Sequence, residues 1–187
     1  MTMRKIIVYT VAYNAEKTLQ RTINSILAQT YDNWMHYCVD NGSNDCTSAI
    51  IRDYAAKDSR IIHFVNKENH AWEQGNTWSD IIKQHSETDF FCWLDADDEY
   101  KPDFFEKMLL FIEKSNLDIA ACGNDFVDVR TDEAEKVRKL NKDIILEGDG
   151  FSEYLSTYHQ FMRTFWAKLY SIAVLRRIDF NRVPSIP

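Results

Sequence analysis

The chain has 187 residues, of which 45% are hydrophobic and 27% are charged. This balance is typical of one compact domain with a sizeable core, and it excludes a disordered or fibrous protein. The net charge is -7 and the basic residues are dispersed along the sequence, which argues against a nucleic-acid partner. We therefore expect a single domain over residues 1–187 that does not bind nucleic acid.

The four cysteines, Cys38, Cys46, Cys92 and Cys122, show no C-x-x-C spacing, and two of them lie within apolar runs. This pattern favours free, buried thiols over a zinc site or a disulfide framework, and with them a reducing cytoplasm. The first residues lack the pattern of a signal peptide, and no apolar segment approaches the length that spans a membrane. The sequence predicts a cytoplasmic protein with at most peripheral contact with the inner face of the membrane.

Short apolar runs alternate with amphipathic segments along the first hundred residues. The runs predict strands at residues 5–11, 34–39, 61–65 and 90–94. The segments between them predict helices that begin with a cap-like sequence at residues 14–17, pass through residues 50–54 and span residues 76–85. This alternation predicts a doubly wound α/β fold, with a mostly parallel central sheet flanked by helices.

The second half of the sequence is less regular. A helix through residues 104–112 is expected to lead to a strand at residues 119–122. Residues 151–158 predict a helix, and residues 165–170 fit either a strand or the edge of an aromatic-rich helix. The run 130–139 mixes charges of both signs, which indicates a solvated loop or helix face with no assigned function.

Four acids, Asp95, Asp97, Asp98 and Glu99, follow the fourth predicted strand directly. Carboxylates this close repel one another unless a cation or hydrogen-bond donors compensate their charge. Mg²⁺ or Mn²⁺ suits them, because these ions bind through one or two carboxylates and complete their shell with water and substrate phosphates. A solvated turn before the next helix is the simpler alternative. A calcium-binding helix-loop-helix site is excluded, because Tyr100 stands where its glycine is required.

The loop at Asp40 and the loop at residues 95–98 both follow predicted strands. Ligands of parallel α/β sheets bind beyond the carboxyl ends of the strands, so both loops are expected at that one edge. The Gly-rich pyrophosphate fingerprint is missing after the first strand, as is any G-x-x-x-x-G-K-[ST] loop. We therefore expect a metal ion, rather than a glycine cradle, to hold the phosphates of a diphosphate substrate.

Four motifs occur in order along nearly the whole chain: Tyr13-Asn14, Asp40-Asn41-Gly42-Ser43, Leu94-Asp95-Ala96-Asp97-Asp98 and Lys168-Leu169-Tyr170. With them the sequence resembles the family 2 glycosyltransferases, which have the GT-A, nucleotide-diphospho-sugar transferase-like fold. The resemblance implies metal-dependent, inverting transfer of a sugar from a nucleoside-diphosphate donor, a UDP-sugar being favoured. The acceptor would be a carbohydrate or glycolipid hydroxyl, in polysaccharide or glycoconjugate synthesis. Residues 1–100 would form the nucleotide-binding half and residues 101–187 the acceptor-side half.

The resemblance also implies where the donor and the metal bind. Asp40 would bind the base or ribose, and Tyr13 would lie along the nucleobase. Asp97 would be the more direct metal ligand, and Asp95 would lie nearer the ribose or a metal-bound water. Asp98 would not contact the metal itself but would lie next to the residues that do. The donor-binding residues that the resemblance implies are Ala12, Tyr13, Asn14, Asp40, Asn41, Asn76, Asp95 and Ala96.

The chain departs from the family pattern in three places. Asn41 stands where a second Asp is usual, which removes a charge and keeps a hydrogen-bonding side chain. Val11 stands where a proline often precedes the tyrosine. Residues 69–76 lack the arginine that often contacts the donor, although Asn76 can hold the position of its neighbouring asparagine. His70 is expected to be a surface residue.

The general base has no motif in this sequence. The family places it on an acidic segment beyond the point where this chain stops, so we expect a truncated or unusually short member. Asp125, Asp149 and Glu153 remain candidates. A non-catalytic nucleotide-sugar-binding domain is therefore a first alternative. A Mg²⁺-dependent phosphotransferase with an aspartyl nucleophile is a second, weaker one, because Val11-Ala12-Tyr13, where that nucleophile usually stands after the first strand, contains no acid.

Overall fold

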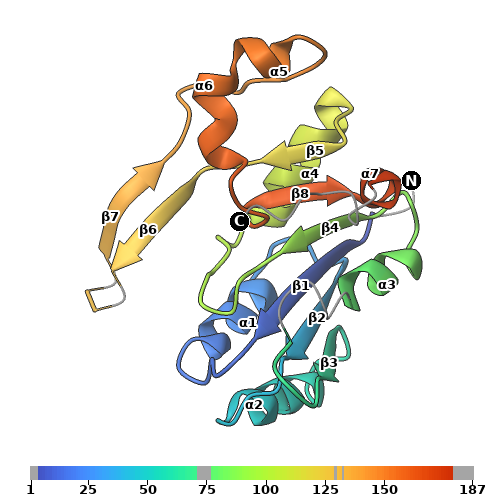
Figure 1. Ribbon diagram of the computed structural model, residues 1–187, viewed down its shortest axis with the longest axis vertical. Coiled ribbons are helices and arrows are strands. Elements are labelled where there is room, and N and C mark those ends of the chain that lie inside the picture. Colours follow the sequence, from blue (N-terminus) through green and yellow to red (C-terminus); the bar gives the residue numbers. More distant parts are fainter. Residues whose placement is uncertain (1–3, 71–76, 129, 132, 179–187) are drawn as a thin grey trace.

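The computed structural model describes residues 4–70, 77–128, 130–131 and 133–178. It contains a six-stranded sheet of order β3-β2-β1-β4-β8-β5, and a two-stranded ribbon, β6–β7, that extends from the body (Figure 1). The strands are β1 (Ile6–Ala12), β2 (Trp34–Asp40), β3 (Ile61–Val65), β4 (Phe90–Trp93), β5 (Ile119–Ala121), β6 (Asn124–Asp128), β7 (Glu133–Arg138) and β8 (Lys168–Ser171). The helices are α1 (Leu19–Leu27), α2 (Thr47–Ala55), α3 (Thr77–Lys83), α4 (Phe104–Ser115), α5 (Gly150–Glu153), α6 (Leu155–Tyr158), the 3-10 helix η1 (His159–Phe161) and α7 (Ile172–Arg177).

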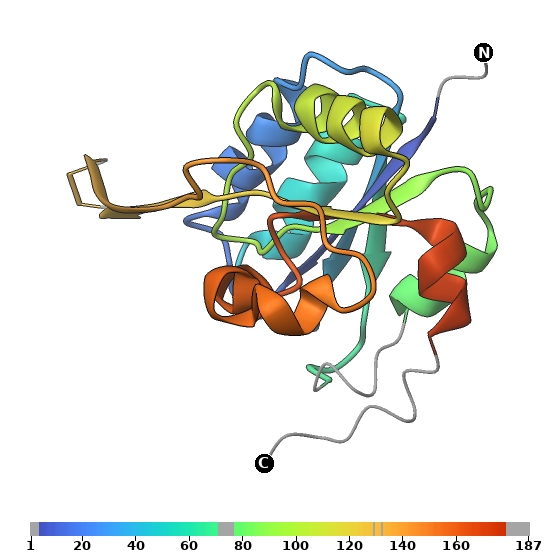
Figure 2. The ribbon, with the colours of Figure 1, turned by 90° about the horizontal axis from the view of Figure 1, so that it is seen from above.

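The predicted α/β architecture is confirmed. β1 pairs in parallel with β2 and β4, and β2 pairs in parallel with β3. Helices α1, α2 and α4 cover one face of the sheet, and α3 and α7 cover the other (Figure 2). Alternate residues of β1 enter two cores: Ile6 packs in a cluster with Ile23 of α1, and Ile7 packs in a cluster with Trp78 of α3. A strand buried on both faces reads as a continuous apolar run, which is why it could be located from the sequence.

Strand β8 is antiparallel and lies between β4 and β5. Of the two alternatives for residues 165–170, the strand is confirmed, although it occupies Lys168–Ser171. Because β8 runs opposite to β4, its first residues lie beside the carboxyl end of β4, where Trp166 forms a bridge with Trp93. The segment that leads into β8 therefore reaches the same edge of the sheet as the loops that follow β1, β2 and β4.

Two predicted elements are wrong in detail. Residues 14–17 form a turn and α1 begins only at Leu19, because Asn14 has a left-handed φ of 49° and the amide of Ala15 donates to Thr47 Oγ1 at 2.8 Å. Glu133–Arg138 forms strand β7, not a solvated loop or helix face. Most of β7 is exposed, so its residues show no alternation of apolar and polar side chains that would signal a strand.

The expectation of free cysteines is confirmed. Cys38 and Cys92 are buried, Cys122 is half-buried and Cys46 is exposed, and all four are free thiols. Burial was expected for cysteines within apolar runs, and it holds for the two that lie in β2 and β4. Across the described parts of the chain, no helix has both the length and the apolar character needed to cross a bilayer.

Candidate functional site

The carboxyl ends of β1, β2 and β4 lie side by side, because the three strands are parallel neighbours. Ala12 pairs with Asp40 where β1 and β2 end, and Tyr9 pairs with Trp93 where β4 ends. The loop that begins at Asp40 and the acidic loop at residues 95–98 therefore open at one edge of the sheet, as predicted.

Reciprocal hydrogen bonds join the β1–α1 loop to the β2–α2 loop. The amide of Asn14 donates to Ser43 Oγ at 3.0 Å, and the amide of Asn44 donates to Asn14 Oδ1 at 2.9 Å. Asparagine tolerates the left-handed backbone that this turn requires at residue 14 better than most residues do. The turn leaves Tyr13 46% exposed at the edge of the sheet. A flat aromatic ring in this position can stack on a planar ligand.

The loop that begins at Asp40 is tightly packed at its start. Asp40 is 2% exposed, and its Oδ1 accepts a hydrogen bond from the amide of Ser43 at 3.0 Å. Gly42 has a φ of 77°, and a Cβ added there would lie 2.6 Å from the carbonyl carbon of Glu68. Glycine is therefore required both for the left-handed backbone and for the close approach of the segment that follows β3.

The side chain of Asn41 is hydrogen-bonded to the segment that follows β3. Its Nδ2 donates to Asn69 Oδ1 at 2.8 Å and to the carbonyl of His70 at 2.9 Å. Its Oδ1 accepts from Asn66 Nδ2 at 2.8 Å and from the amide of His70 at 3.3 Å. An aspartate could not supply the two donated bonds, so the asparagine at this position has a structural reason. His70, expected to be a surface residue, is half-buried against this network and lines a pocket.

The acidic loop carries negative charge that Arg21 offsets only in part. Burial, and then the charge of Asp97, raises the pKa of Asp95. Burial and the charges of Asp95 and Asp97 raise the pKa of Asp98 to about 6, against the opposing effect of Arg21. Arg21 also fixes the loop from α1, because its guanidinium donates to the carbonyl of Asp97 at 3.3 Å and lies 3.6 Å from Glu99 Oε1.

The donor atoms of this loop fit a divalent cation that is shared with a ligand. Within the described residues, no three His, Cys, Asp or Glu side chains are placed to hold a metal ion by themselves. Asp95 and Asp97 nevertheless line one pocket, where burial, and after it the charge of Asp97, raises the pKa of Asp95. Two carboxylates, with the remaining positions left to water and phosphate oxygens, are a usual set of ligands for Mg²⁺ or Mn²⁺.

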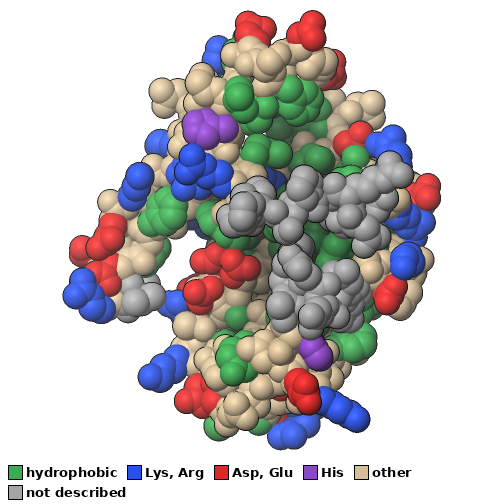
Figure 3. All heavy atoms as spheres, viewed as in Figure 1, with side chains coloured by type: hydrophobic (Ala, Val, Ile, Leu, Met, Phe, Trp, Pro, Cys, Tyr) green, Lys and Arg blue, Asp and Glu red, His purple; other side chains and the backbone are tan. Residues whose placement is uncertain are grey.

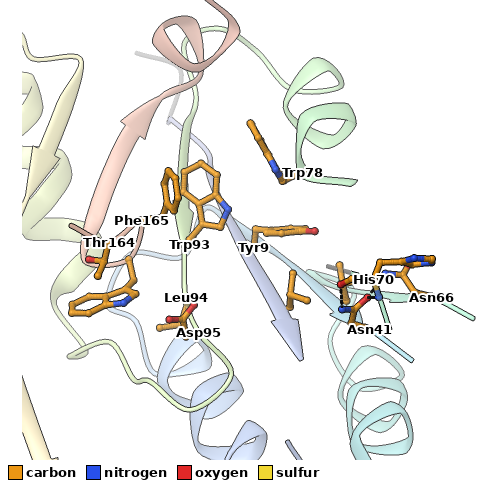
Figure 4. Close-up of a pocket in the computed structure, with 13 residues that line it drawn as sticks. Tyr9, Asn41, Asn66, His70, Trp78, Trp93, Leu94, Asp95, Thr164 and Phe165 are labelled. Atoms are coloured by element: carbon orange, nitrogen blue, oxygen red, sulfur yellow. Dashed lines mark hydrogen bonds between the residues drawn. The ribbon is translucent and has the colours of Figure 1, made fainter. Parts of the chain in front are cut away.

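Two pockets meet at Asp95. The smaller pocket, of about 370 Å³, is lined by Val11, Tyr13, Asn14, Ala15, Thr18, Asp95, Ala96 and Asp97. The larger pocket, of about 390 Å³, is lined by Tyr9, Val11, Val39, Asn41, Asn66, His70, Trp78, Trp93, Leu94, Asp95, Thr164, Phe165 and Trp166. In Figure 4 its Trp93 and Phe165 lie beside each other and away from the amide side chains of Asn41 and Asn66. Acidic side chains gather beside the opening that separates the β6–β7 ribbon from the body (Figure 3).

The structure brings together most, but not all, of the residues singled out in the sequence. Tyr13, Asn14, Asp95, Ala96 and Asp97 line the smaller pocket, and Asn41 lines the larger one. Ala12 is buried at the end of β1 beside Asp40. Asn76 lies outside the described residues. Of the candidate bases Asp125, Asp149 and Glu153, none lines either pocket as described, and Asp125 is paired with Lys101 at 2.6 Å.

Aromatic residues of the larger pocket were missed by the sequence analysis. Tyr9, Trp78 and Trp93 lie in segments that their apolar patterns identified only as core elements. Phe165 and Trp166 lie in an irregular segment whose position depends on the antiparallel pairing of β8. The density of aromatic residues in that segment was the one available signal.

The mixed sheet and the acidic loop beside its edge are those of a GT-A glycosyltransferase domain. The profile described as Glycosyl transferase family 2 matches residues 7–177, and the chain belongs to this family. An uncharacterized glycosyltransferase of Haemophilus influenzae is 30% identical over 81% of this chain and 60% of its own length. Glycosyltransferase GlyA of Streptococcus pneumoniae is 27% identical over 95% of this chain and 26% of its own length. The chain thus spans less than two thirds of these curated relatives.

Solved structures share the fold. S. aureus TarS 1-349 in complex with UDP-GlcNAc superimposes with a TM-score of 0.60 at 17% identity, covering 94% of this chain and 47% of TarS. The mannosyltransferase PcManGT of Pyrobaculum calidifontis, in complex with GDP-Man and Mn2+, gives a TM-score of 0.62 at 14% identity, covering 95% of this chain and 48% of that protein. Likeness at this level of identity establishes the architecture alone.

Proposed function

We propose that this chain binds a nucleoside-diphosphate sugar with a divalent cation and transfers the sugar, with inversion, to a hydroxyl of a carbohydrate or glycolipid acceptor in polysaccharide or glycoconjugate synthesis. The observation that carries the proposal is the smaller pocket, which Tyr13, Asp95 and Asp97 line together. A base stacked on Tyr13 and a diphosphate beside the two carboxylates can then belong to one molecule. Family membership supports the same reaction class.

A UDP-sugar is the favoured donor. TarS has been solved with UDP and with UDP-GlcNAc, and PcManGT with GDP-Man and Mn2+. The base would lie between Tyr13 and the loop that begins at Asp40. The asparagine that follows Asp40 has its side chain committed to the protein, so it shapes this loop without adding charge. Residues 1–100 would thus hold the nucleotide, while residues 101–187 would face the acceptor.

Different residues would bind the cation, the nucleoside and the sugar. A bound Mn²⁺ or Mg²⁺ supplies stabilisation of the negative charge that develops on the departing diphosphate. Asp97 and Asp95 would hold that ion, and Tyr13 would orient the nucleoside. The acceptor hydroxyl approaches from the face opposite the diphosphate and loses its proton to a carboxylate. Trp93 and Phe165, whose ring centroids lie 5.3 Å apart, offer apolar faces on which a sugar ring can pack in the larger pocket.

A non-catalytic nucleotide-sugar-binding domain is the second candidate function. It is favoured by one observation, which is that Asp125, Asp149 and Glu153 line neither described pocket. Without a base near the acceptor, the chain would bind the donor and release it unchanged. Release of UDP from a UDP-sugar, measured with and without oligosaccharide acceptors, separates the two functions because a binding domain yields none.

The proposal is tested by removing the proposed metal ligand. Asp97→Ala should lower the affinity for UDP in the presence of Mn²⁺ by about 100-fold, because the cation loses a charged ligand. Isothermal titration calorimetry with UDP, with and without Mn²⁺, measures this loss. The control is Asp53→Ala, which removes an exposed carboxylate of α2 that lies 3.9 Å from Arg52. Unchanged Mn²⁺-dependent affinity in Asp97→Ala, in a variant that unfolds like the parent, would contradict the site.

A further inference from the structure

Lys168 is a buried cation at the start of β8. The residue is 1% exposed and is among the largest fully buried side chains. Its ammonium group donates hydrogen bonds to the carbonyl of Thr164 and, at 3.3 Å, to the carbonyl of Trp166. Among the ion pairs of the described residues, none includes Lys168. A buried charge without a carboxylate partner is unfavourable for stability alone, so a packing role explains it poorly.

The carbonyl groups that accept these hydrogen bonds belong to Thr164 and Trp166, in a segment that lines the larger pocket. Thr164, Phe165 and Trp166 all line that pocket. In Figure 4, Thr164 and Phe165 lie across the pocket from Asn41. The next residue, Ala167, has a left-handed φ of 57°, which is unfavourable for a residue with a Cβ. The segment is therefore strained where it joins β8. The ammonium bonds, together with the bond from the Cys122 amide to the Ala167 carbonyl at 3.0 Å, hold it in place.

The charged and titratable groups that face the ammonium are few. Burial lowers the pKa of Lys168 to about 8, with the charge of Arg138 from β7 acting in the same direction and Cys122 beside β5 opposing it. Burial raises the pKa of the Cys122 thiol to about 11, so this group is uncharged near neutral pH. Carbonyl dipoles are thus the main partners of the cation, and near neutral pH its charge strengthens both bonds.

We propose that Lys168 is a positioning residue whose ammonium group holds Thr164–Trp166 as a wall of the larger pocket, and thereby sets the affinity for the sugar moiety of the donor. The identification of that ligand rests on the proposed function. A base on Tyr13 and a diphosphate beside Asp97 would occupy the smaller pocket. The sugar would then continue past Asp95, which lines both pockets, toward the wall that Lys168 holds.

Hydrogen–deuterium exchange tests the structural step without any ligand. Lys168→Met keeps the length and apolar stem of the side chain and removes the bonds to the two carbonyls. Peptides covering residues 161–168 should exchange at least tenfold faster in this variant, while peptides from β1 and β2 are unchanged. Lys142→Met, which changes an exposed lysine, should match the parent throughout. Equal protection of residues 161–168 in Lys168→Met and in the parent overturns the proposal.

Calorimetry with Mn²⁺ tests the consequence for the site. UDP should bind Lys168→Met within about twofold of the parent, whereas the additional affinity of UDP-GlcNAc over UDP should fall at least fivefold. Lys168→Arg, which retains a cation with several donors, should keep most of that difference. A general loss of structure would weaken both ligands together, so equal losses for UDP and UDP-GlcNAc also overturn the proposal.

The remaining outcomes are separable. If the parent binds neither ligand, or binds UDP-GlcNAc no better than UDP, the donor assignment fails and the exchange experiment alone decides the role of Lys168. If Lys168→Met does not fold, the parent is compared at pH 7 and pH 9.5, with rates corrected for the intrinsic pH dependence of exchange. Deprotonation of the ammonium should then raise exchange in residues 161–168 relative to β2, and no relative change contradicts the proposal.

Discussion

The region from β1 to β4 and the region from β5 to β8 reach the same pocket by different means. Every residue of β1 and β2 except Val11 and Met35 is buried, and the neighbouring helices pack on both faces. In the later region, α5 and α6 contribute no buried residue, and β7 is largely exposed. The side of the edge formed by β1, β2 and β4 therefore rests on a continuous core, whereas the opposite wall depends on the few buried residues of β8.

This difference has a consequence for stability and for binding. Changes in the first region should act on global unfolding, because its side chains form the shared core. Changes in the later region should act locally, since segments with few buried contacts open at low free energy without unfolding the rest. The following predictions compare matched positions in the two regions.

The largest difference is expected for phenylalanine truncation. Phe91 of β4 is fully buried, and its ring lies 4.6 Å from that of Trp93 between centroids. Phe91→Ala should lower the free energy of unfolding by about 3–5 kcal/mol through lost burial and a cavity. Phe151 of α5 is 50% exposed, and Phe151→Ala should cost under about 1 kcal/mol. Urea unfolding measures both, and comparable losses would refute the contrast.

Acid should destabilise the first region through His36. Burial lowers the pKa of His36 to about 3. Below the unfolded pKa of about 6.5 the unfolded state binds a proton that the folded state does not, so stability falls as pH decreases toward 3. Between pH 7 and pH 4.5 this linkage amounts to about 2–3 kcal/mol.

Asp98 titrates in the opposite sense. Its pKa is raised to about 6, so its contribution to stability is largest at low pH and is lost as pH rises through 6. Asp98 is present in both His36→Leu and the parent, so the difference between their pH profiles of stability measures the contribution of His36. Chemical unfolding from pH 4.5 to pH 7 should show a flatter profile for His36→Leu than for the parent. His159→Leu, at an exposed position in the later region, should keep the profile of the parent, and a flattened profile there would argue against the assignment.

Two glycines, Gly42 and Gly148, both have a left-handed backbone, but only Gly42 lies close to another segment. Comparing them distinguishes the cost of the backbone conformation from the cost of a steric clash. A Cβ at Gly42 would lie 2.6 Å from the backbone of Glu68, whereas a Cβ at Gly148 would meet no heavy atom within 4 Å. Gly148→Ala should cost about 1 kcal/mol for the left-handed conformation alone. Gly42→Ala should cost about 1–3 kcal/mol and should also weaken nucleotide binding, because the segment after β3 must move. Equal effects in thermal unfolding would show that the approach is not tight.

Much of the region from β1 to β4 could be predicted, because the apolar and polar patterns in its sequence match the burial of its residues in the fold. Strand β4 reads as a short apolar run because both of its faces are covered, and the acids after it mark its carboxyl end. The ribbon β6–β7 could not be predicted in the same way. Its strands pair with each other away from the core, so burial imposes no period on the sequence.

The position of the candidate site could be predicted to the extent that it lies at the carboxyl ends of parallel strands and in the loops after them. Asp40 is the last residue of β2, and Tyr13 and Asp97 lie in the loops after β1 and β4, so the rule for parallel sheets is sufficient to bring the three positions to one edge. The aromatic wall depends on a different relation. Phe165 lies beside Trp93 because β8 enters the sheet antiparallel, and a pairing across many intervening residues leaves no mark in a single sequence.

Asn41→Asp should have a small effect, and its direction is informative. The substitution restores the acid that is usual in the family but places a carboxylate where the amide now donates to Asn69 Oδ1 and to the His70 carbonyl. Loss of these bonds should lower the free energy of unfolding by about 1 kcal/mol. UDP affinity should fall slightly rather than rise, since the wall shaped by residues 66–70 loosens. Calorimetry and urea unfolding measure both, with exposed Asn141→Asp as the control for added charge. Tighter UDP binding by Asn41→Asp would mean that position 41 contacts the nucleotide directly, and that the amide network is only incidental.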